Sequence, residues 1–234
     1  MSRVRDFRRE VWEVLSSAPD LPRLLETLRR FPPRKLVSPL IGAFCHREEV
    51  VRWRAILSLG PTVARIAEED LEAARVVIRR LMWMLNEESG GMAWGAPEGM
   101  AECLYHHPRL SEEYTSILVS YLRPDGNMLE YPPAQRGVAW GIGRLAERER
   151  ERLLTFRAHE YLKPLLSSPD FAVAGLSAWA LGRMAPFPEQ KFIIPRLEAL
   201  LSREEEIFFY DGNRLSPHPV RALAKEALEL MGGG

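Results

Sequence analysis

The sequence predicts an all-α protein, a right-handed superhelix of about six stacked helical hairpins. The first observation is a repeat, because residues 132–146 and 169–185 share one pattern. The aligned pairs are Gly143 with Gly182, Arg144 with Arg183, Trp140 with Trp179 and Ala139 with Ala178. The second observation is that Asp-Gly-Asn occurs at 125–127 and at 211–213, in equivalent places of the same alignment. A period near forty residues, about two helices per repeat, is the sequence signature of a helical solenoid.

Helical periodicity continues through the whole chain. Apolar residues recur at steps of three and four, and an N-terminal helical pair is expected before residue 31, as a cap over residues 1–33. The hairpins expected after the cap are 36–45 with 50–67, 71–85 with a helix from 96, 112–122 with 134–148, 156–166 with 171–184, and 189–201 with 220–231. We interpret residues 1–234 as one repeat domain, with the repeats over 34–231.

Prolines and caps give the helix boundaries. Pro61 is expected to kink the helix over 50–67 or to split it after Gly60. Pro97 suits the first turn of the helix that starts near residue 96, because a backbone N–H has no partner in the helix there. Asp170 is a candidate N-cap for the helix over 171–184. Three long connections, over 86–95, 123–133 and 204–219, interrupt the pattern. Insertions of this kind often lie on the binding face of a solenoid.

Composition limits the classes of partner. Apolar residues make up 46% of the 234 residues, which is enough for a continuous core. The formal charge is zero, with 32 basic and 32 acidic side chains, so the net attraction to phosphate that drives non-specific nucleic-acid binding is missing. Duplex nucleic acid is therefore not an expected partner.

The cysteines and the chain ends indicate a cytoplasmic protein. Cys45 and Cys103 fall in predicted helices of different repeats, so neither a disulfide framework nor a metal knuckle is expected. The N-terminal segment is charged and lacks an apolar leader. The longest uncharged stretch, over 171–182, is too short to cross a bilayer. We expect no metal, no cofactor and no membrane association.

The segment over 51–60, Val-Arg-Trp-Arg-Ala-Ile-Leu-Ser-Leu-Gly, carries a family resemblance. Its pattern V-R-x-x-A-x-x-x-L-G resembles a HEAT repeat, in particular the short type named after phycobilisome lyases. The resemblance covers roughly residues 34–231 and departs from the pattern at 134–135 and 173–174, where the usual Arg is absent. It implies an α-solenoid and says little about chemistry, because such repeats serve as scaffolds, adaptors and occasional enzymes.

A candidate recognition surface follows from the repeat register. Equivalent residues of the second helices stack across repeats, and three such columns are expected to point away from the core onto a concave wall. The candidate binding residues are Trp53, Trp94, Glu98, Glu102, Arg136, Trp140, Arg144, Trp179 and Arg183. Tryptophan and arginine are typical of binding hot spots. In the alternative, Trp140 and Trp179 fill gaps beside neighbouring glycines, and Arg136 forms only an ion pair with Glu98.

Two further features of this surface have alternative interpretations. Glycines flank Trp94, which leaves the backbone free to approach a ligand, or simply makes a flexible connection with a packed aromatic anchor. Glu98 and Glu102 are four residues apart, so one of them could have a raised pKa and act as an acid or base. A structural ion network with Arg136 is the alternative.

Catalytic patterns are otherwise weak. Cys103 and His106 lack a second pair to complete a zinc site. The Asp-Gly-Asn segments lack the downstream ligands of a calcium loop and are interpreted as tight turns.

Three functions compete. A non-enzymatic scaffold that binds a protein or peptide on its concave face ranks first, because it requires no chemistry that the residues fail to show. A nucleic-acid repair enzyme similar to HEAT-like DNA glycosylases comes second, and the neutral charge argues against it. A lyase or isomerase acting on phycobilins is implied only by the name of the repeat.

Overall fold

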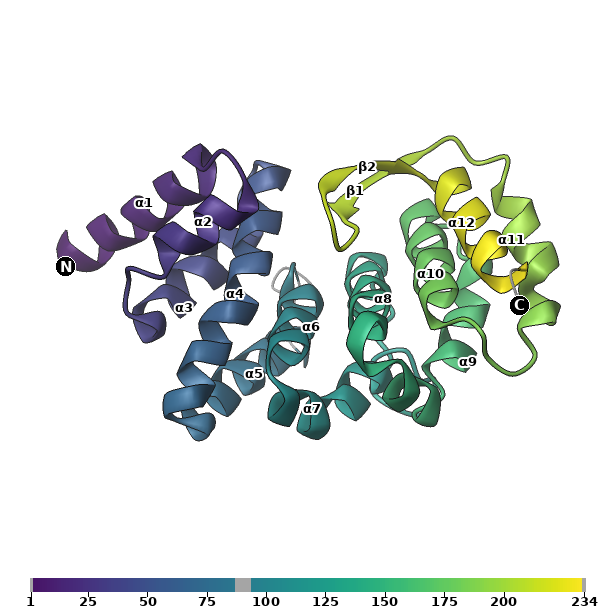
Figure 1. Ribbon diagram of the computed structural model, residues 1–234, viewed down its shortest axis with the longest axis horizontal. Helices are drawn as coiled ribbons and strands as arrows, with labels where there is room; N and C mark the ends of the chain where they lie inside the picture. The colour runs from purple at the N-terminus through teal and green to yellow at the C-terminus, as the bar shows by residue number, and fades with distance from the viewer. Residues whose placement is uncertain (1, 87–93, 233–234) are drawn as a thin grey trace. The chain divides into compact units, whose positions relative to one another are not determined.

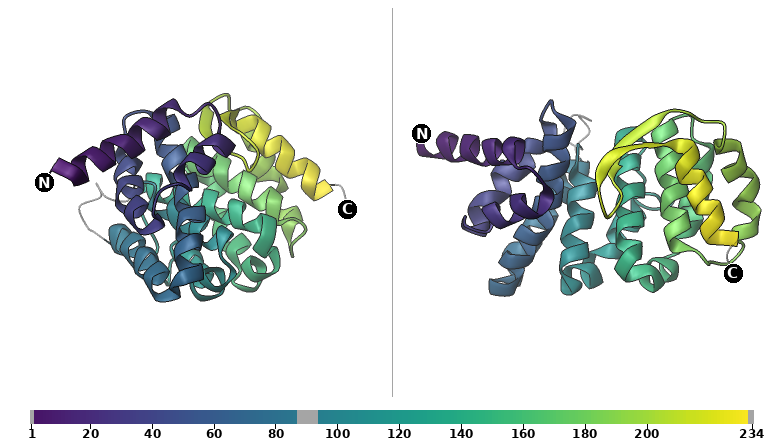
Figure 2. Two further views of the ribbon diagram at one scale, coloured as in Figure 1. Left: turned by 60° about the vertical axis from the view of Figure 1, so that its left-hand side comes forward. Right: turned by 45° about the horizontal axis from the view of Figure 1, so that its top comes forward.

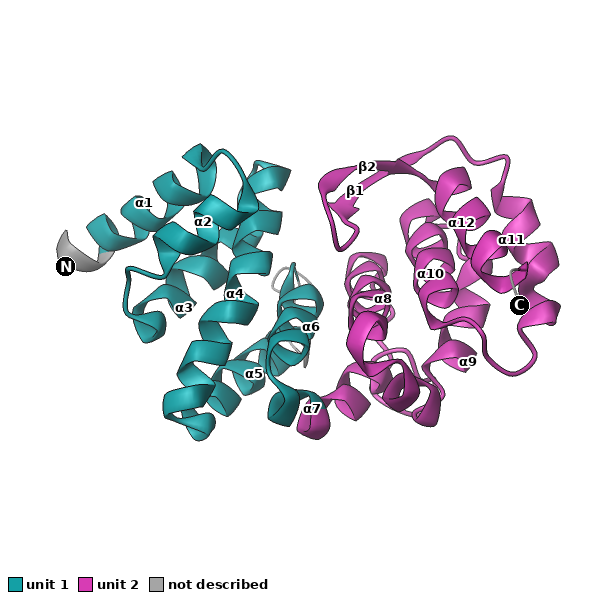
Figure 3. Ribbon diagram, in the orientation of Figure 1, with its two compact units in different colours: residues 1–111 teal, residues 112–234 magenta. Residues whose placement is uncertain are grey.

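The computed structural model describes residues 2–86 and 94–232. Its helices lie in antiparallel pairs, as the sequence predicts for a helical repeat solenoid (Figure 1). The chain divides into two compact units, residues 1–111 and residues 112–234 (Figure 3). Both units contain fully buried apolar residues, so each has a hydrophobic core of its own.

Unit 1 is built around helix α4. Its elements are α1 (Ser2–Ser17), α2 (Leu21–Leu28), α3 (Pro33–Gly42) with the short 3₁₀ helix η1 (Ala43–Cys45), α4 (Glu49–Glu69), α5 (Leu71–Asn86) and α6 (Ala96–His106). Helix α4 packs against α3, α5 and α6. Helices α1 and α2 form the helical pair expected before residue 31. Helix α7 (Pro108–Ser120) begins at the end of unit 1 and continues into unit 2.

Unit 2 is built around helix α10. Its other elements are α8 (Pro132–Thr155), α9 (Ala158–Leu162) with η2 (Lys163–Ser167), η3 (Gln190–Ile193), α11 (Ile194–Leu200), strands β1 (Glu206–Tyr210) and β2 (Leu215–Pro219), and α12 (Val220–Gly232). Helix α10 (Phe171–Met184) lies between α8 and α12 (Figure 1). Every residue from 172 to 182 is buried, which explains the long uncharged stretch in the sequence. Asp170 is its N-cap, as predicted, because its side chain accepts hydrogen bonds from the amides of Ala172 and Val173.

Strands β1 and β2 form an antiparallel hairpin within the connection over 204–219, where the sequence analysis expected no strand. The hairpin reaches from α12 across α10 toward α8 (Figures 1 and 2). Its turn is the predicted Asp-Gly-Asn segment. The Asp211 side chain accepts from the amides of Asn213 and Arg214, each at 2.8 Å, and Gly212 has φ +102°, a left-handed value that favours glycine.

Two prolines remove hydrogen-bond donors from the edge of β2 that faces away from β1. The amide of Val220 donates to the carbonyl of Glu205 at 2.9 Å, and hydrogen-bonded pairs alternate along an antiparallel ladder. Pro217 and Pro219 therefore fall at the intervening positions, where the backbone nitrogen faces away from β1. Because proline has no N–H, this edge presents no donor to another strand there.

Glycines set the distance between successive second helices. A Cβ atom on Gly60 of α4 would lie 2.6 Å from the carbonyl oxygen of Glu102 on α6. A Cβ on Gly182 of α10 would lie 2.8 Å from the Cα of Ala227 on α12. Both distances are shorter than real Cβ contacts, so these helices meet at backbone distance. The glycine column found in the sequence repeat is therefore a packing requirement.

The sequence predicts that Pro61 either kinks this helix, α4, or splits it after Gly60. Helix α4 is continuous through Pro61, so the split does not occur. Proline clashes with the Cβ of the residue before it when that residue is helical, and Gly60 has no Cβ. Residues 55–60 and 62–63 are buried, so packing on neighbouring helices supports the turn that lacks one backbone hydrogen bond.

We expect the substitution Gly143→Ala to lower the free energy of unfolding by about 1–3 kcal/mol. The new Cβ on α8 would lie 2.3 Å from Cζ3 of the Trp179 indole on α10. The matched control is Gly42→Ala, where the nearest atom, on Trp12, is 3.7 Å away. The control should be neutral or stabilising by up to about 1 kcal/mol, since alanine favours a helix over glycine. Urea titrations compare the two, and equal effects would contradict the packing described.

Candidate functional site

The predicted wall of outward-facing side chains is mostly inside the protein. The relative exposures are 8% for Trp53, 1% for Glu102, 0% for Trp140, 6% for Arg144 and 2% for Trp179. The prediction that these five side chains point away from the core is therefore wrong. Their burial has a different cause in each unit.

In unit 2 the hairpin covers the two tryptophans. The indole nitrogen of Trp140 donates to the carbonyl of Tyr210 at 2.7 Å. The Trp179 ring meets the ring of Phe209 edge-on, with centroids 5.2 Å apart and planes at 74°. Trp179 also fills the space that Gly143 leaves on α8. The gap-filling alternative from the sequence thus describes Trp179, which packs against Gly143.

Arg144 and Arg183, each four residues after one of these tryptophans, contact the end of the hairpin. Arg144 donates to Glu147 at 2.6 Å and lies over the Tyr210 ring, 5.4 Å from its centroid. Arg183 donates to the other oxygen of Glu147 at 2.8 Å and to the backbone carbonyl of Asp211 at 2.5 Å. Charge-assisted bonds to a carboxylate are among the stronger hydrogen bonds in proteins. The recurring arginines therefore stabilise an internal contact.

Arg136 forms an ion pair with Asp170 at the start of α10. It donates from Nε to Asp170 at 2.9 Å and makes a second bond to the same carboxylate through Nη2. Partial burial raises the pKa of Asp170, but the bonds from Arg136 and from the amides of Val173 and Ala172 outweigh it and lower the pKa overall. This ion pair within unit 2 fixes the N-cap, which is a structural role.

In unit 1 the start of helix α6 differs from the rest of the wall. Trp94 is 42% exposed, and Gly95 after it has φ +70°. The ring of Phe44 fits against Gly95 and Gly99, where Cβ atoms would lie 2.9 and 2.8 Å from ring carbons. Only glycine allows this approach, so Phe44 fixes the first turn of α6. Residues 87–93 of the glycine-rich connection lie outside the described residues.

Glu98, in that first turn, has a buried oxygen without a partner. Its Oε2 is sealed from solvent and accepts no hydrogen bond. Burial raises the pKa of Glu98 to about 7, although a hydrogen bond from its own backbone amide and the charge of Arg52 oppose the shift. Glu102 lies 3.2 Å from Nε2 of His106. Of the two carboxylates in the predicted pair, Glu98 is the one whose pKa burial raises.

The remaining candidates form no metal or membrane site. Cys103 is buried, which raises the pKa of its thiol, and its neighbour Glu102 raises it further. Among the described residues, no three His, Cys, Asp or Glu side chains are placed to hold a metal ion. In the same part of the chain, none of the helices has the length and apolarity needed to cross a bilayer.

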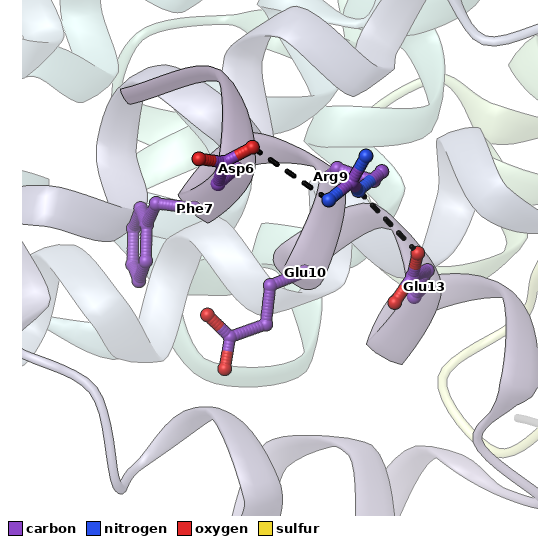
Figure 4. A pocket seen from close by; sticks show the side chains of 5 residues that line it. All are labelled: Asp6, Phe7, Arg9, Glu10 and Glu13. Carbon is purple, nitrogen blue, oxygen red and sulfur yellow. Dashed lines mark ion pairs between the residues drawn. The ribbon is translucent and has the colours of Figure 1, made fainter. Parts of the chain in front are cut away.

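A surface depression on α1 is too open to bind a small molecule tightly. Figure 4 shows the residues that line it, Asp6, Phe7, Arg9, Glu10 and Glu13. Arg9 pairs with Asp6 at 3.6 Å and with Glu13 at 3.8 Å, and all three side chains are more than half exposed. Such pairs contribute about 0–1 kcal/mol and are screened by salt.

The sequence analysis missed the hairpin and Phe44. The run Ile207-Phe208-Phe209-Tyr210 before an Asp-Gly-Asn turn is a strand and hairpin signal, which the strong helical periodicity elsewhere obscured. The contact between Phe44 and the glycines of α6 has no local signal, because the two segments are about fifty residues apart.

Comparisons with known proteins agree on a helical repeat fold. No protein-family model matches the sequence. An uncharacterized protein of Archaeoglobus fulgidus is 35% identical over 204 residues, which cover 86% of this chain and 98% of that protein. Among solved structures, an engineered protein aligns with a TM-score of 0.57 and 19% identity, over 97% of this chain and 91% of the other. A designed armadillo repeat protein in complex with the peptide (KR)4 aligns with a TM-score of 0.53 and 20% identity, over 94% and 98% of the two chains.

We expect Phe209→Ala to destabilise the protein by about 3–5 kcal/mol, because Phe209 is fully buried between the hairpin and α10. The control is Phe192→Ala, since Phe192 is 66% exposed and its loss should change stability by less than about 0.5 kcal/mol. Chemical denaturation followed by circular dichroism measures both. A Phe209→Ala protein as stable as the control would show that the hairpin does not complete the core.

We expect Glu98→Gln to stabilise the protein at pH 8 and to change little at pH 4. The pKa of Glu98 is about 7 in the folded state against 4.5 ordinarily, so the unfolded chain releases this proton first. Stability is therefore lost as pH rises from 4.5 through 7, by up to about 3 kcal/mol. Thermal unfolding across this range tests it, with the exposed Glu130→Gln as control. A stability difference that does not grow with pH would contradict the burial of Glu98.

Proposed function

We propose that this chain, which belongs to the same family as the Archaeoglobus fulgidus protein, is a non-enzymatic interaction module that binds a protein or peptide partner. The proposal treats residues 1–234 as one repeat domain of the HEAT type, with residues 1–33 as a cap. Helical repeats of this kind present extended surfaces formed by successive second helices. The designed armadillo repeat protein with a similar fold is in complex with a peptide, which supports the same use of this fold here.

The observation that carries the proposal is the start of α6 in unit 1. An exposed tryptophan, Trp94, stands four residues before Glu98, whose Oε2 lacks a hydrogen-bond partner. A large exposed aromatic side chain is typical of a binding hot spot, and native proteins rarely leave a buried polar atom without a hydrogen bond. In unit 2, Trp140 and Trp179 are already covered by the hairpin, so the proposed contact uses Trp94 and Glu98.

We expect Trp94→Ala to reduce recovery of the native partner at least about tenfold, the usual effect of losing a tryptophan hot spot. Affinity purification of the tagged chain from its native host, with quantitative mass spectrometry, measures the recovery. Trp83→Ala is the matched control, because Trp83 is 58% exposed on helix α5, which is the first helix of its pair. If both variants recover the same proteins in the same amounts as the wild type, the proposed surface is not used.

A further inference from the structure

Helix α1 carries a stripe of alternating charge on its outer face. Asp6, Arg9 and Glu13 are spaced three and four residues apart, which places them on one side of the helix. The Arg9 guanidinium lies between the two carboxylates, 3.6 Å from Asp6 and 3.8 Å from Glu13 (Figure 4). The opposite side of α1 is in the core, where Val11 and Leu15 are fully buried. This α1 stripe, with charges in the order negative, positive, negative, is therefore exposed to solvent.

The next helix, α2, carries the inverse stripe. Arg23, Glu26 and Arg30 have the same spacing of three and then four residues, with charges in the order positive, negative, positive. The chain continues to turn past the end of α2, since the amide of Arg30 donates to the carbonyl of Thr27 at 3.2 Å. All three charged side chains are exposed and line one cavity of about 330 Å³ between α1 and α2. Among the described residues, none forms an ion pair with this α2 stripe.

We infer that the α1 stripe of one molecule binds the α2 stripe of a second copy of this chain. When the two helices lie parallel and in register, every charge meets the opposite charge. The facing pairs are Asp6 with Arg23, Arg9 with Glu26 and Glu13 with Arg30. A two-fold axis forms this contact twice, because the α2 stripe of the first molecule then meets the α1 stripe of the second. The inference goes beyond the proposed function and does not involve Trp94 or Glu98.

The order of the charges favours a second copy over a nucleic acid or a lipid phosphate. Each stripe contains both signs, so a phosphate on the α2 stripe would be repelled by Glu26, and on the α1 stripe by Asp6 and Glu13. Protein surfaces that bind each other carry complementary potentials, which fix the register and suppress other partners. A second copy supplies the matching order of charges for both stripes at once.

The contact is expected to be weak and sensitive to salt. Exposed ion pairs each contribute little, and dissolved ions screen them. Val14 and Pro19 add apolar surface to the cavity beside the α2 stripe. Obligate dimers bury larger and more apolar interfaces than these stripes offer, so the dimer is a transient one.

Sedimentation velocity measures the self-association at increasing protein concentration. The salt concentrations are about 0.01 M and about 1 M, where the screening length is about 30 Å and about 3 Å. We expect the wild type to dimerise at low salt and to be monomeric at high salt. The variant Arg23→Glu with Arg30→Glu should dimerise at least about tenfold more weakly, because two of the three facing pairs become repulsive. The converse variant, Asp6→Arg with Glu13→Arg, should lose dimerisation for the same reason.

Mixing the two variants separates a lost contact from misfolding. The unchanged α1 stripe of the first variant matches the unchanged α2 stripe of the second, and the two altered stripes match each other, so the mixture should associate. The charge control is Arg47→Glu with Lys225→Glu, which changes the net charge as much as the first variant. These two side chains are 90% and 73% exposed and lie outside both stripes, so the control should dimerise like the wild type.

Three results would overturn the inference. A wild type that stays monomeric at low salt would do so, and would leave the stripes available to a different protein. Equal loss of dimerisation in the charge control would show that net charge alone governs association. The third result is a mixture of the two variants that fails to associate although circular dichroism shows both to be folded.

Discussion

The structure depends on second helices that touch at backbone distance. Gly60 of α4 meets the carbonyl of Glu102, and Gly182 of α10 meets Ala227, at separations that no side chain would allow. Gly143 gives the same room to the Trp179 indole. A glycine in a helix costs about 1 kcal/mol relative to alanine, so its recurrence in this column reflects close packing. Helices stacked this closely bury most of what their inner faces carry.

The consequences differ between the two units. In unit 2 the inner faces of α8 and α10 are covered by the chain's own hairpin, and the buried indole of Trp140 finds a backbone carbonyl. Uncovering Trp140, Trp179 and Phe209 together would cost several kcal/mol, at about 1.5–3 kcal/mol for each large apolar side chain, so the hairpin is a permanent part of the core. In unit 1 the start of α6 keeps an exposed Trp94 and an unsatisfied Glu98.

The sequence predicted the architecture well because the solenoid is encoded locally. The bounds of α10, the Asp170 cap and the Asp-Gly-Asn turn all depend on short-range signals. The outward direction of Trp140 and Trp179 was wrong, since it depends on a hairpin about thirty to seventy residues away. The burial of Glu98 likewise depends on how α6 packs in the fold, although its four-residue spacing from Glu102 did single out the pair. Repeat patterns fix which residues are equivalent, and the insertions decide which of them stay exposed.

The account is tested most directly by the titration of the Glu98 carboxyl group itself. Carbon NMR of the ¹³C-labelled side chain follows its ionisation, and the resonance is assigned by its absence in Glu98→Gln. A carboxyl group in the first turn of α6 whose Oε2 is buried and accepts no hydrogen bond should titrate with a midpoint near pH 7. A midpoint near 4.5, the ordinary value for glutamate, would show that the group is solvated, and the proposed site would lose its basis.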